Sequence, residues 1–424
     1  MSDFSQKTFR VVNLGCKLNF AEASTIARQL VGLGFVQASA KNSADVYVVN
    51  TCAVTEQSEK KCRQTIRKLA KDNSSATICI TGCYLSLKPF ELKQMPEVTL
   101  VADKNEVAQK IADYFSVAHC QLPTDNFFPA YSSGDRTRSF LKVQDGCDYG
   151  CSYCTVPLAR GASRNIPIEK VVQQAREVAA QGVNEIIITG VNIGDFGKST
   201  GESFLQLAQA LEKVEGISRY RISSIEPNLL ANEIIDFVAA SQKFLPHFHI
   251  PLQAASNRVL GLMRRRYTRE LFAERLQRIR AKMPLAFIGV DVIAGFPTEA
   301  DEEFESGYNF LRELQPAYLH VFPYSKRPNT PAAEMQQTPS AKITEHAKRL
   351  GELCEKLHLD FYKKNVGQTA HVLFESARKG GLMFGFTENY IKVALPYTAE
   401  LVNKVTAVRL TGISSEGYMQ CKVG

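Results

Sequence analysis

The stretch Gln-Asp-Gly-Cys-Asp-Tyr-Gly-Cys-Ser-Tyr-Cys, residues 144–154, decides how this 424-residue chain is interpreted. Its three cysteines, Cys147, Cys151 and Cys154, follow a C-x3-C-x2-C spacing that places three thiols on one short loop, with no fourth cysteine or histidine nearby. A cubane iron–sulfur cluster has four irons and normally takes four thiolates. A loop that supplies only three can therefore leave one iron open to a substrate or cofactor.

This spacing, with Tyr153 directly before the last cysteine, resembles the signature of the radical S-adenosylmethionine (SAM) superfamily. In that superfamily the open iron chelates the amino and carboxylate groups of SAM, and one electron cleaves SAM to a 5′-deoxyadenosyl radical. A structural zinc loop is the alternative interpretation. Zinc sites, however, are usually four-coordinate and built from C-x2-C pairs, so the spacing favours the iron–sulfur cluster.

The composition is that of a soluble globular protein, with 45% apolar and 22% charged residues and a moderate net charge of +8. No apolar run reaches membrane-spanning length, and residues 1–7 lack the basic and apolar regions of a signal peptide. We therefore expect a cytoplasmic protein with no membrane partner. Eleven cysteines in a reducing compartment favour metal or cluster ligation, or buried thiols, over disulfides.

The pattern of strands and helices predicts an α/β protein of three parts. Residues 7–120 alternate short β-branched runs with helical stretches, which is typical of an open, doubly wound parallel sheet. The expected strands are residues 9–14, 45–50 and 77–81, and the expected helices include 21–33 and 56–70. Residues 121–138 interleave Pro, Ser, Gly and Asp and are interpreted as a linker.

A second α/β series covers residues 139–364. Its six strand candidates are residues 140–144, 185–189, 219–225, 247–252, 287–293 and 318–323. Six such units predict a partial (βα)6 barrel, smaller than a full eightfold one, followed by a long polar helix at 343–364. Residues 366–424 lose the helical pattern, and short strands at 371–375, 390–395 and 404–410 predict a small antiparallel barrel.

A second set of three cysteines lies in the first domain. Cys16, Cys52 and Cys83 each follow the C-terminal end of an expected strand. Ligands in open α/β sheets gather at that edge, so these loops can converge on an iron–sulfur cluster with one open iron. Buried cysteines are common, and three coincidental thiols are the alternative. The other five cysteines share no spacing and are expected to be inert; they are Cys62, Cys79, Cys120, Cys354 and Cys421.

The two triplets and their flanks together resemble the methylthiotransferases over nearly the whole chain. The matching stretches are Asn-Leu-Gly-Cys-Lys-Leu-Asn at 13–19, Asn-Thr-Cys-Ala-Val-Thr at 50–55 and Thr-Val-Pro-Leu-Ala-Arg-Gly at 155–161. The resemblance implies an N-terminal cluster domain, a radical SAM partial barrel and a C-terminal TRAM domain that binds RNA. Lys17-Leu18-Asn19 and Ala53-Val54-Thr55 are similar to the branch that acts on threonylcarbamoyladenosine in tRNA. The isopentenyladenosine branch typically has Gln-Met-Asn and a Ser/Ala-Ile-Arg continuation, and the ribosomal-protein branch has Pro-Lys-Asn.

The reaction implied by this resemblance is C2-methylthiolation of N6-threonylcarbamoyladenosine at position 37, next to the anticodon. General acid–base catalysis contributes only about two to four orders of magnitude and cannot remove an aromatic C–H at neutral pH, so we expect hydrogen-atom abstraction. The implied cofactors are two [4Fe–4S] clusters and two SAM molecules, one methylating a sulfur held at the Cys16 triplet and one supplying the radical at the Cys147 triplet. The expected partners are the tRNA anticodon stem-loop, an electron donor such as flavodoxin or ferredoxin, and a sulfur source.

Further cofactor contacts are expected at the ends of the barrel strands, where catalytic groups collect. Gly190 and Asn192 follow the second strand, in a stretch that departs from the common Gly-Gly-Glu pattern of the superfamily. The other candidates are Tyr153, Ser223, Glu226, His249, Gln253 and Asp291. His249 and Asp291 are equally consistent with hydrogen-bonded polar groups of the core.

The run Arg264-Arg265-Arg266-Tyr267 is the candidate RNA-binding stretch, since it pairs basic groups with an aromatic ring that can hold phosphate and a splayed base. A solvated helix face is the alternative. Three other functions remain open at this point. They are a non-catalytic RNA-binding protein with zinc or structural clusters, a methylthiotransferase for isopentenyladenosine in tRNA, and one for a ribosomal-protein aspartate, which the flanks of Cys16 and Cys52 disfavour.

Overall fold

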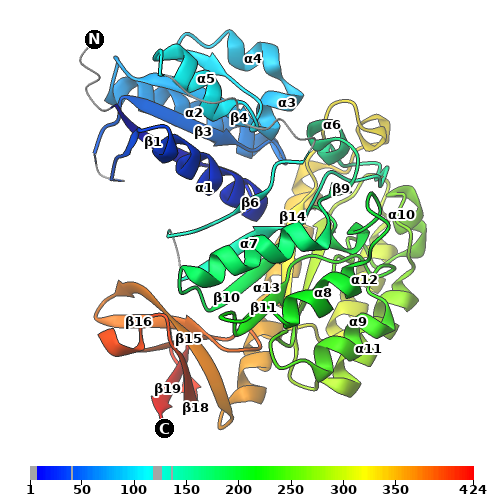
Figure 1. Cartoon of the computed structure of the whole chain (residues 1–424). Helices are drawn as coiled ribbons and strands as arrows, with labels where there is room; N and C mark the ends of the chain where they lie inside the picture. Colours follow the sequence, from blue (N-terminus) through cyan, green and yellow to red (C-terminus); the bar gives the residue numbers. More distant parts are fainter. Residues whose placement is uncertain (1–6, 40–41, 118–126, 135–136) are drawn as a thin grey trace.

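The N-terminal part of the chain forms a parallel sheet covered by helices, as the alternating pattern predicts (Figure 1). In the computed structural model, which describes residues 7–39, 42–117, 127–134 and 137–424, the strand order is β2-β1-β3-β4-β5 and every pairing is parallel. The strands are β1 (Thr8–Asn13), β2 (Val36–Gln37), β3 (Val46–Thr51), β4 (Thr77–Gly82) and β5 (Leu100–Val101). The helices are α1 (Lys17–Gly32), α2 (Glu56–Asp72), α3 (Cys83–Leu87), α4 (Pro89–Lys93) and α5 (Val107–Tyr114).

The two faces of this sheet bury separate cores, which makes it doubly wound. Ile26 of α1 and Ile111 of α5 pack with Val48 on one face. Ile66 of α2 packs with Ile80 on the other face. Strand β3 is buried along its whole length because both of its faces are covered, so it lacks the polar alternation of a half-exposed strand.

The middle of the chain forms six parallel strands that curve into a partial barrel, which confirms the predicted class. They are β7 (Arg138–Lys142), β10 (Glu185–Thr189), β11 (Arg219–Ile222), β12 (His247–His249), β13 (Phe287–Ala294) and β14 (Tyr318–Pro323). Two sheets, ordered β11-β10-β7-β6 and β12-β13-β14, are joined by bridges from Tyr220 to Phe244 and from Ser224 to His249. Part of the expected linker forms β6 (Ala130–Tyr131), which pairs antiparallel with β7; residues 121–126 and 135–136 of it lie outside the described residues.

Helices cover the outside of the barrel. They are α7 (Ile168–Ala180), α8 (Phe204–Glu212), α9 (Asn232–Ala240), α10 (Asn257–Leu262), α11 (Arg269–Lys282), α12 (Asp301–Leu314) and the long α13 (Ser340–Asn365). The residues that face them alternate along each strand, as in Ile288, Val290 and Val292 of β13, which belong to the main hydrophobic core. The intervening residues of each strand therefore point to the inside of the barrel. The smaller elements of the catalytic edge are β8 (Gln144–Asp145), α6 (Val156–Arg160) and β9 (Arg164–Asn165).

The C-terminal residues form a closed five-stranded barrel in the order β15-β16-β17-β19-β18. Its strands are β15 (Thr369–Lys379), β16 (Leu382–Phe386), β17 (Lys392–Pro396), β18 (Val405–Ile413) and β19 (Met419–Val423). Four pairings are antiparallel as predicted, and the β17–β19 pairing is parallel. Two of the strands, β16 and β19, were absent from the sequence prediction.

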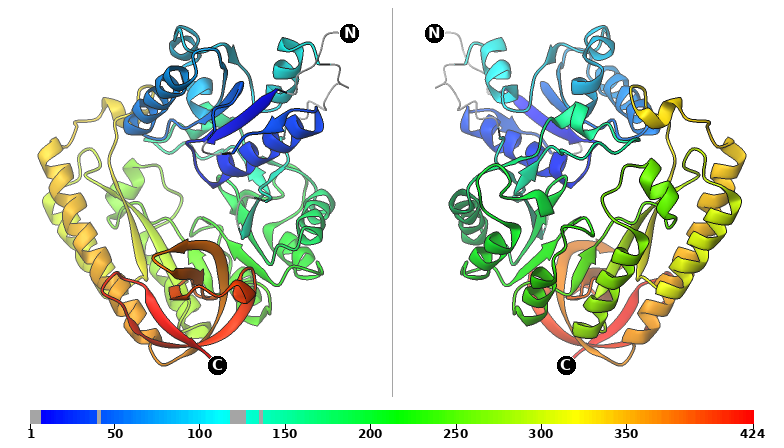
Figure 2. Two further views of the ribbon diagram at one scale, coloured as in Figure 1. Left: turned by 90° about the vertical axis from the view of Figure 1, so that its left-hand side faces the viewer. Right: turned by 90° about the vertical axis from the view of Figure 1, so that its right-hand side faces the viewer.

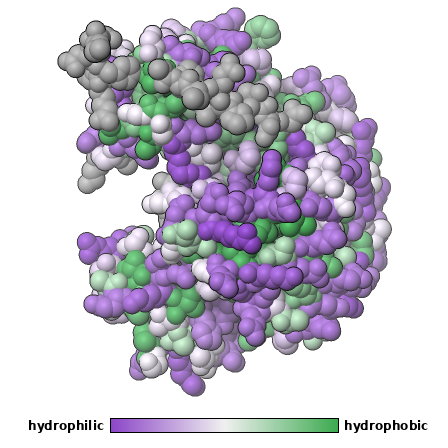
Figure 3. All heavy atoms as spheres, viewed as in Figure 1, coloured by the Kyte–Doolittle hydropathy of each residue, from purple (hydrophilic) through white to green (hydrophobic). Residues whose placement is uncertain are grey.

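The three parts are stacked. The six-stranded partial barrel, called the core from here on, lies between the N-terminal sheet and the C-terminal barrel (Figure 2). Arg221 of β11 donates to the carbonyls of Thr387 and Glu388, and Glu185 of β10 neutralises it at 2.8 Å. The loop between β16 and β17 thus closes the lower end of the core. Figure 3 shows a notch on one face of the molecule between the N-terminal and C-terminal parts. Among the described residues, no helix is both long and apolar enough to cross a membrane.

Candidate functional site

The loop of Cys147, Cys151 and Cys154 follows strand β8 at the upper edge of the core. Gly146 gives this loop its sharp entry, with φ +70° and so little space that a Cβ would overlap the carbonyl of Ala162. Cys151 is buried, and the other two thiols are partly exposed. The loop therefore presents its sulfurs at the edge where barrel strands end, which is where catalytic groups of such barrels lie.

Hydrogen-bond donors surround these sulfurs. The backbone N–H of Tyr149 lies 3.3 Å from Cys147 Sγ, that of Val156 lies 3.4 Å from Cys154 Sγ, and Arg265 Nη1 lies 3.1 Å from Cys151 Sγ. Burial raises the pKa of Cys147 to about 11 and that of Cys154 to about 12, so thiolates at this loop need such donors and a bound metal. The donor set fits an iron–sulfur cluster held by three thiolates.

Cys16, Cys52 and Cys83 converge, as predicted, at the carboxyl edge of the N-terminal sheet, directly after β1, β3 and β4. Buried polar contacts fix the three loops. Asn19 and Asn50 exchange two hydrogen bonds, from Asn19 Nδ2 to Asn50 Oδ1 (2.9 Å) and from Asn50 Nδ2 to the Asn19 carbonyl (2.8 Å). Two further features fix these loops. The Thr51 hydroxyl donates to the Thr81 carbonyl at 2.6 Å. Gly82 has a φ of +95°, and a Cβ added there would overlap the backbone of Thr51.

Arg160 links the two cysteine sets. Its guanidinium is buried, donates to Asn19 Oδ1 at 3.0 Å, and pairs with Glu22 and Asp145. The same Asn19 Oδ1 accepts from Cys16 Sγ at 3.2 Å. The neighbouring cations hold the pKa values of Glu22 and Asp145 below their usual range despite burial, which by itself raises them. Two lysines complete this network, Lys104 and Lys142.

A cavity of about 190 Å³ lies beside Cys154 and the segment that follows Cys52. Its wall on the N-terminal side is Val54 and Thr55, just after Cys52, and its wall on the core side includes Tyr153 and Cys154. Residues from the ends of β13 and β14 complete the wall, among them Ile293, Phe322 and Arg327. Val54 and Phe322 are exposed by 56% and 48% although apolar, so the cavity offers free hydrophobic surface next to Cys154 and close in sequence to Cys52.

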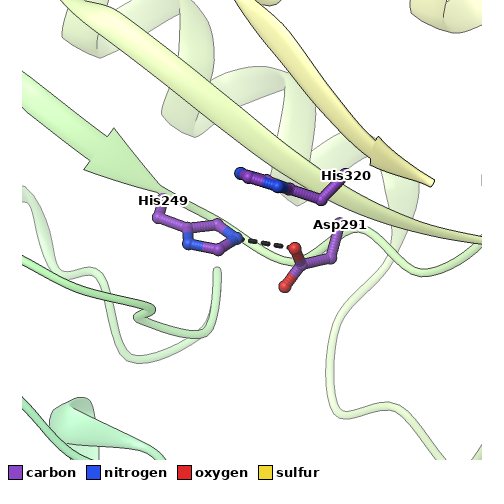
Figure 4. A group of neighbouring side chains, drawn as sticks. All are labelled: His249, Asp291 and His320. Atoms are coloured by element: carbon purple, nitrogen blue, oxygen red, sulfur yellow. Dashed lines mark hydrogen bonds and ion pairs between the residues drawn. The ribbon is translucent and has the colours of Figure 1, made fainter. Parts of the chain in front are cut away.

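Neither cysteine triplet brings all three of its sulfurs within 4.8 Å of one another. Among the described residues, the only three metal-ligating side chains whose donor atoms lie within 4.8 Å of one another are His249, Asp291 and His320. The thiols of each triplet are spread more widely, as a cluster of four irons requires and a tetrahedral zinc ion does not allow. In the histidine group, His249 Nε2 already bonds Asp291 Oδ1 at 2.6 Å (Figure 4).

The structure places three of the predicted cofactor residues, Tyr153, Glu226 and Asn192, in or beside the Cys147 loop. Glu226 pairs with Arg265, whose other nitrogen contacts Cys151 and Tyr153. The Asn192 N–H donates to Gln144 Oε1 at 2.9 Å. Of the remaining candidates, His249 ends β12, and Gly190 and Ser223 directly follow β10 and β11. Gln253 lies in the segment after β12, and Asp291 lies in the middle of β13 rather than at its end.

Several buried side-chain oxygens at this edge have no hydrogen-bond partner among the described residues, and they include Ser152 Oγ of the cysteine loop. Asn192 Oδ1 and Ser223 Oγ are both inaccessible to solvent and unsatisfied among the described residues. Unpaired buried polar atoms are rare because each costs free energy. A polar cofactor such as SAM would satisfy both, so the residues present fit that ligand.

The expected RNA-binding stretch divides into two pairs. Arg264 and Arg266 are exposed, as an RNA contact needs. Arg265 and Tyr267 are buried, and the Tyr267 hydroxyl donates to the Pro251 carbonyl at 2.8 Å. The expectation that these two contact RNA is wrong for this structure, because their side chains pack beneath the cysteine loop.

Sequence reasoning missed three residues of the site. Arg160 appeared only as part of a quoted motif, although a charged residue six positions after Cys154 was the available signal. Arg265 was assigned to RNA rather than to the cysteine loop. His320 is directly opposite Asp291 in the pairing of β13 and β14, and only that register identifies it.

Comparisons with known proteins agree with this geometry. Residues 8–103 match the family described as uncharacterized protein family UPF0004, and residues 141–311 match the radical SAM superfamily. Threonylcarbamoyladenosine tRNA methylthiotransferase MtaB of Bacillus subtilis is 36% identical over 417 residues, covering 94% of this chain and 92% of that protein. The protein of the same name in Aquifex aeolicus is 35% identical and covers 90% and 94%.

A more distant relative is tRNA-2-methylthio-N(6)-dimethylallyladenosine synthase of Pelotomaculum thermopropionicum, which is 30% identical over 96% of this chain and 95% of its own length. Among solved structures, the radical SAM methyltransferase TsrM of Kitasatospora setae, with cobalamin and a [4Fe–4S] cluster bound, superposes with a TM-score of 0.55 at 15% identity. That match covers 89% of this chain and 80% of the other, and shows a shared fold.

Proposed function

The chain belongs to the family of threonylcarbamoyladenosine tRNA methylthiotransferases, and on that premise we propose that it methylthiolates C2 of N6-threonylcarbamoyladenosine at position 37 of tRNA. The enzyme uses SAM and two [4Fe–4S] clusters. When bound, these groups supply the one-electron chemistry that an unactivated aromatic C–H requires. We assign one cluster to Cys16, Cys52 and Cys83 and the other to Cys147, Cys151 and Cys154.

The observation that carries this proposal is the cavity lined by Val54 and Thr55, two and three residues after Cys52, and by Tyr153 and Cys154 of the Cys147 loop. A base inside it contacts the Cys147 loop and the segment that holds Cys52, and in this proposal it reaches both cysteine sets. Exposed Phe322 and Val54 offer apolar contact to a flat ring. A reaction that joins a sulfur to a base carbon after hydrogen abstraction needs both sites next to one substrate position.

The surrounding side chains have distinct tasks in this proposal. Arg265 positions Cys151 and Glu226 together, because its guanidinium contacts both. Asn192 and Ser223 bind polar groups of SAM through their unsatisfied oxygens. Arg160 holds the N-terminal sheet against the core through Glu22 and so keeps the two cysteine sets at a fixed separation.

The enzyme acts on tRNA, and we propose that it grips the anticodon stem-loop. Arg264 and Arg266 lie beside the cysteine loop, where Arg266 stacks over the Tyr149 ring at 4.1 Å. The C-terminal barrel is TRAM-like and adds a second RNA contact, as small barrels often do. A cytoplasmic location, a flavodoxin or ferredoxin as electron donor, and a separate sulfur source complete the proposal.

The test uses anaerobically reconstituted protein with a chemical reductant, SAM, sulfide and synthetic anticodon stem-loops. One stem-loop carries threonylcarbamoyladenosine at position 37, and the other carries dimethylallyladenosine. Mass spectrometry of the digested nucleosides should show the methylthio product with the first RNA and at least tenfold less with the second. Product only with the dimethylallyl RNA would contradict the proposed substrate, and Cys147→Ala protein provides the inactive control.

A further inference from the structure

The inside of the core barrel carries a small group of polar residues at mid-height. Because Ile288, Val290 and Val292 face the outer helices, Asp291 faces inward, and its cross-strand partner His320 does the same. His249 of β12 bonds Asp291 and stacks on the His320 ring with 4.7 Å between centroids (Figure 4). The Asp291 carboxylate is therefore already compensated by an imidazole of its own domain.

Lys17 of the N-terminal sheet domain faces this interior. On helix α1 it precedes Phe20 by three residues, so the two share one side of the helix. The Phe20 ring packs edge-on against Phe140 of β7 with 5.6 Å between centroids, and Phe140 points away from the outer helices because its neighbour Leu141 packs among them. Lys17 lies one turn nearer to Cys16 on the same side.

The electrostatic surroundings agree with that placement. The pKa of His320 is lowered to about 4, mainly by burial, with further lowering by His249 and by the positive charge of Lys17, while the Asp291 carboxylate opposes the shift. Lys17 also lowers the pKa of His247, one layer below, where burial is the main cause. The ammonium thus lies within electrostatic reach of β12 and β14, and those histidines are neutral around it.

Helix stability does not explain a lysine at this position. Lys17 is the first residue of a 16-residue helix that has no acidic residue in its first turn, and a cation there opposes the helix dipole. Its side chain is exposed, and it makes no hydrogen bond or ion pair with any residue that the structure describes. An uncompensated cation that faces a reaction chamber is suited to an anionic ligand.

We propose that Lys17 determines substrate choice by pairing with the carboxylate of the threonylcarbamoyl group, an inference that rests on the proposed function. C2 and C6 of adenine flank the same ring nitrogen, so the substituent on N6 lies along the edge that carries the reacting carbon. That carbon must reach the sulfur delivered at the Cys16 triplet, and Lys17 is the residue next to Cys16. A dimethylallyl group carries no charge and would leave the ammonium without a partner.

The experiment removes either the positive charge of Lys17 or the negative charge of the substrate carboxylate. Full-length Lys17→Gln, Lys17→Arg and Lys93→Gln proteins are compared with the unchanged protein; Lys93 is an exposed lysine of α4 and serves as the matched control. The substrates are stem-loops with threonylcarbamoyladenosine or with its neutral methyl ester. Lys17→Gln should reduce kcat/KM for the acid by about 10- to 100-fold, the range for one charged hydrogen bond, and change the ester by less than about threefold.

Binding measured by fluorescence anisotropy without reductant should show the same selective loss, with Lys17→Arg close to the unchanged protein. Iron content must match across all four proteins. The inference is overturned if the unchanged protein treats acid and ester alike, or if Lys17→Gln weakens both equally. If the unchanged protein modifies only the dimethylallyl stem-loop, the proposed function falls and this inference falls with it.

Discussion

The two cysteine triplets reach comparable positions by opposite routes. Cys147, Cys151 and Cys154 lie within eight residues on one loop, whose own backbone N–H groups reach the sulfurs. Cys16, Cys52 and Cys83 come from three strands and are held by side chains that include Asn19 and Asn50. A local ligand set depends on one turn of chain, whereas a distributed set depends on the register of a whole sheet and on its contact with the core.

The largest effect should follow from removing the local set. We expect the triple substitution of Cys147, Cys151 and Cys154 by Ala to lower iron from about eight to about four per chain and to abolish 5′-deoxyadenosine formation. Iron and sulfide analysis with liquid chromatography of the nucleoside measures both. Unchanged iron in a folded variant would show that this loop holds no cluster.

Removing the distributed set should have a smaller effect, because SAM cleavage at the Cys147 loop remains. Ala at Cys16, Cys52 and Cys83 should again leave about four irons, abolish the methylthio product and preserve SAM cleavage. The measurement is 5′-deoxyadenosine release in the presence of tRNA. Loss of that release, with the iron of the Cys147 loop intact, would mean that the two sites do not act independently.

Replacing Asn50 tests whether the distributed set depends on contacts between its loops in a way that the local set does not. Asn50→Ala breaks the paired hydrogen bonds with buried Asn19, which costs about 1–3 kcal/mol and should release iron from the distributed set alone upon mild chelation. Asn73→Ala removes hydrogen bonds in the same domain away from the sulfurs and serves as the control for general destabilisation. Equal iron loss from both variants would show that the Asn19–Asn50 contact has no special role.

The smallest effect concerns RNA contact at the local loop. Replacing Arg264 and Arg266 by Gln should flatten the dependence of tRNA affinity on salt by about 0.7 to 0.9 log units per lost phosphate contact, and should leave tRNA-independent SAM cleavage unchanged. Anisotropy titrations at several salt concentrations measure this slope. Retention of the full slope would place the RNA contact elsewhere, with the C-terminal barrel as the next region to test.

Much of the fold was predictable because strand patterning is a local signal. The predicted bounds of β10 and β14 match those observed, while β12 ends at His249, three residues earlier than expected. The chain leaves the sheet there, and Gln253 adopts φ +65°, a turn that an apolar run does not reveal. Part of the predicted linker is a strand, because Ala130 and Tyr131 pair with β7.

The candidate site was predictable to the extent that it was local. Spacing identified the Cys147 loop, and strand ends identified the other three cysteines. Arg160 and Glu22 are 138 positions apart, so no window of sequence joins them. Arg264 has φ +58°, and this left-handed turn separates the exposed Arg264 and Arg266 from the buried Arg265, which a run of three arginines conceals.

The loop between β16 and β17 closes the lower end of the core, and this loop is among the last parts of the chain to be synthesised. Arg221 finds its carbonyl partners at Thr387 and Glu388, more than 160 positions later in the chain. His247 likewise contacts the Tyr390 ring at a tilted angle, with 4.7 Å between ring centroids. Because synthesis proceeds from the N-terminus, Arg221 of the nascent barrel has Glu185 as a partner but lacks these carbonyl acceptors at an open lower end until the last strands leave the ribosome. A sealed reaction chamber is therefore a property of the finished chain only.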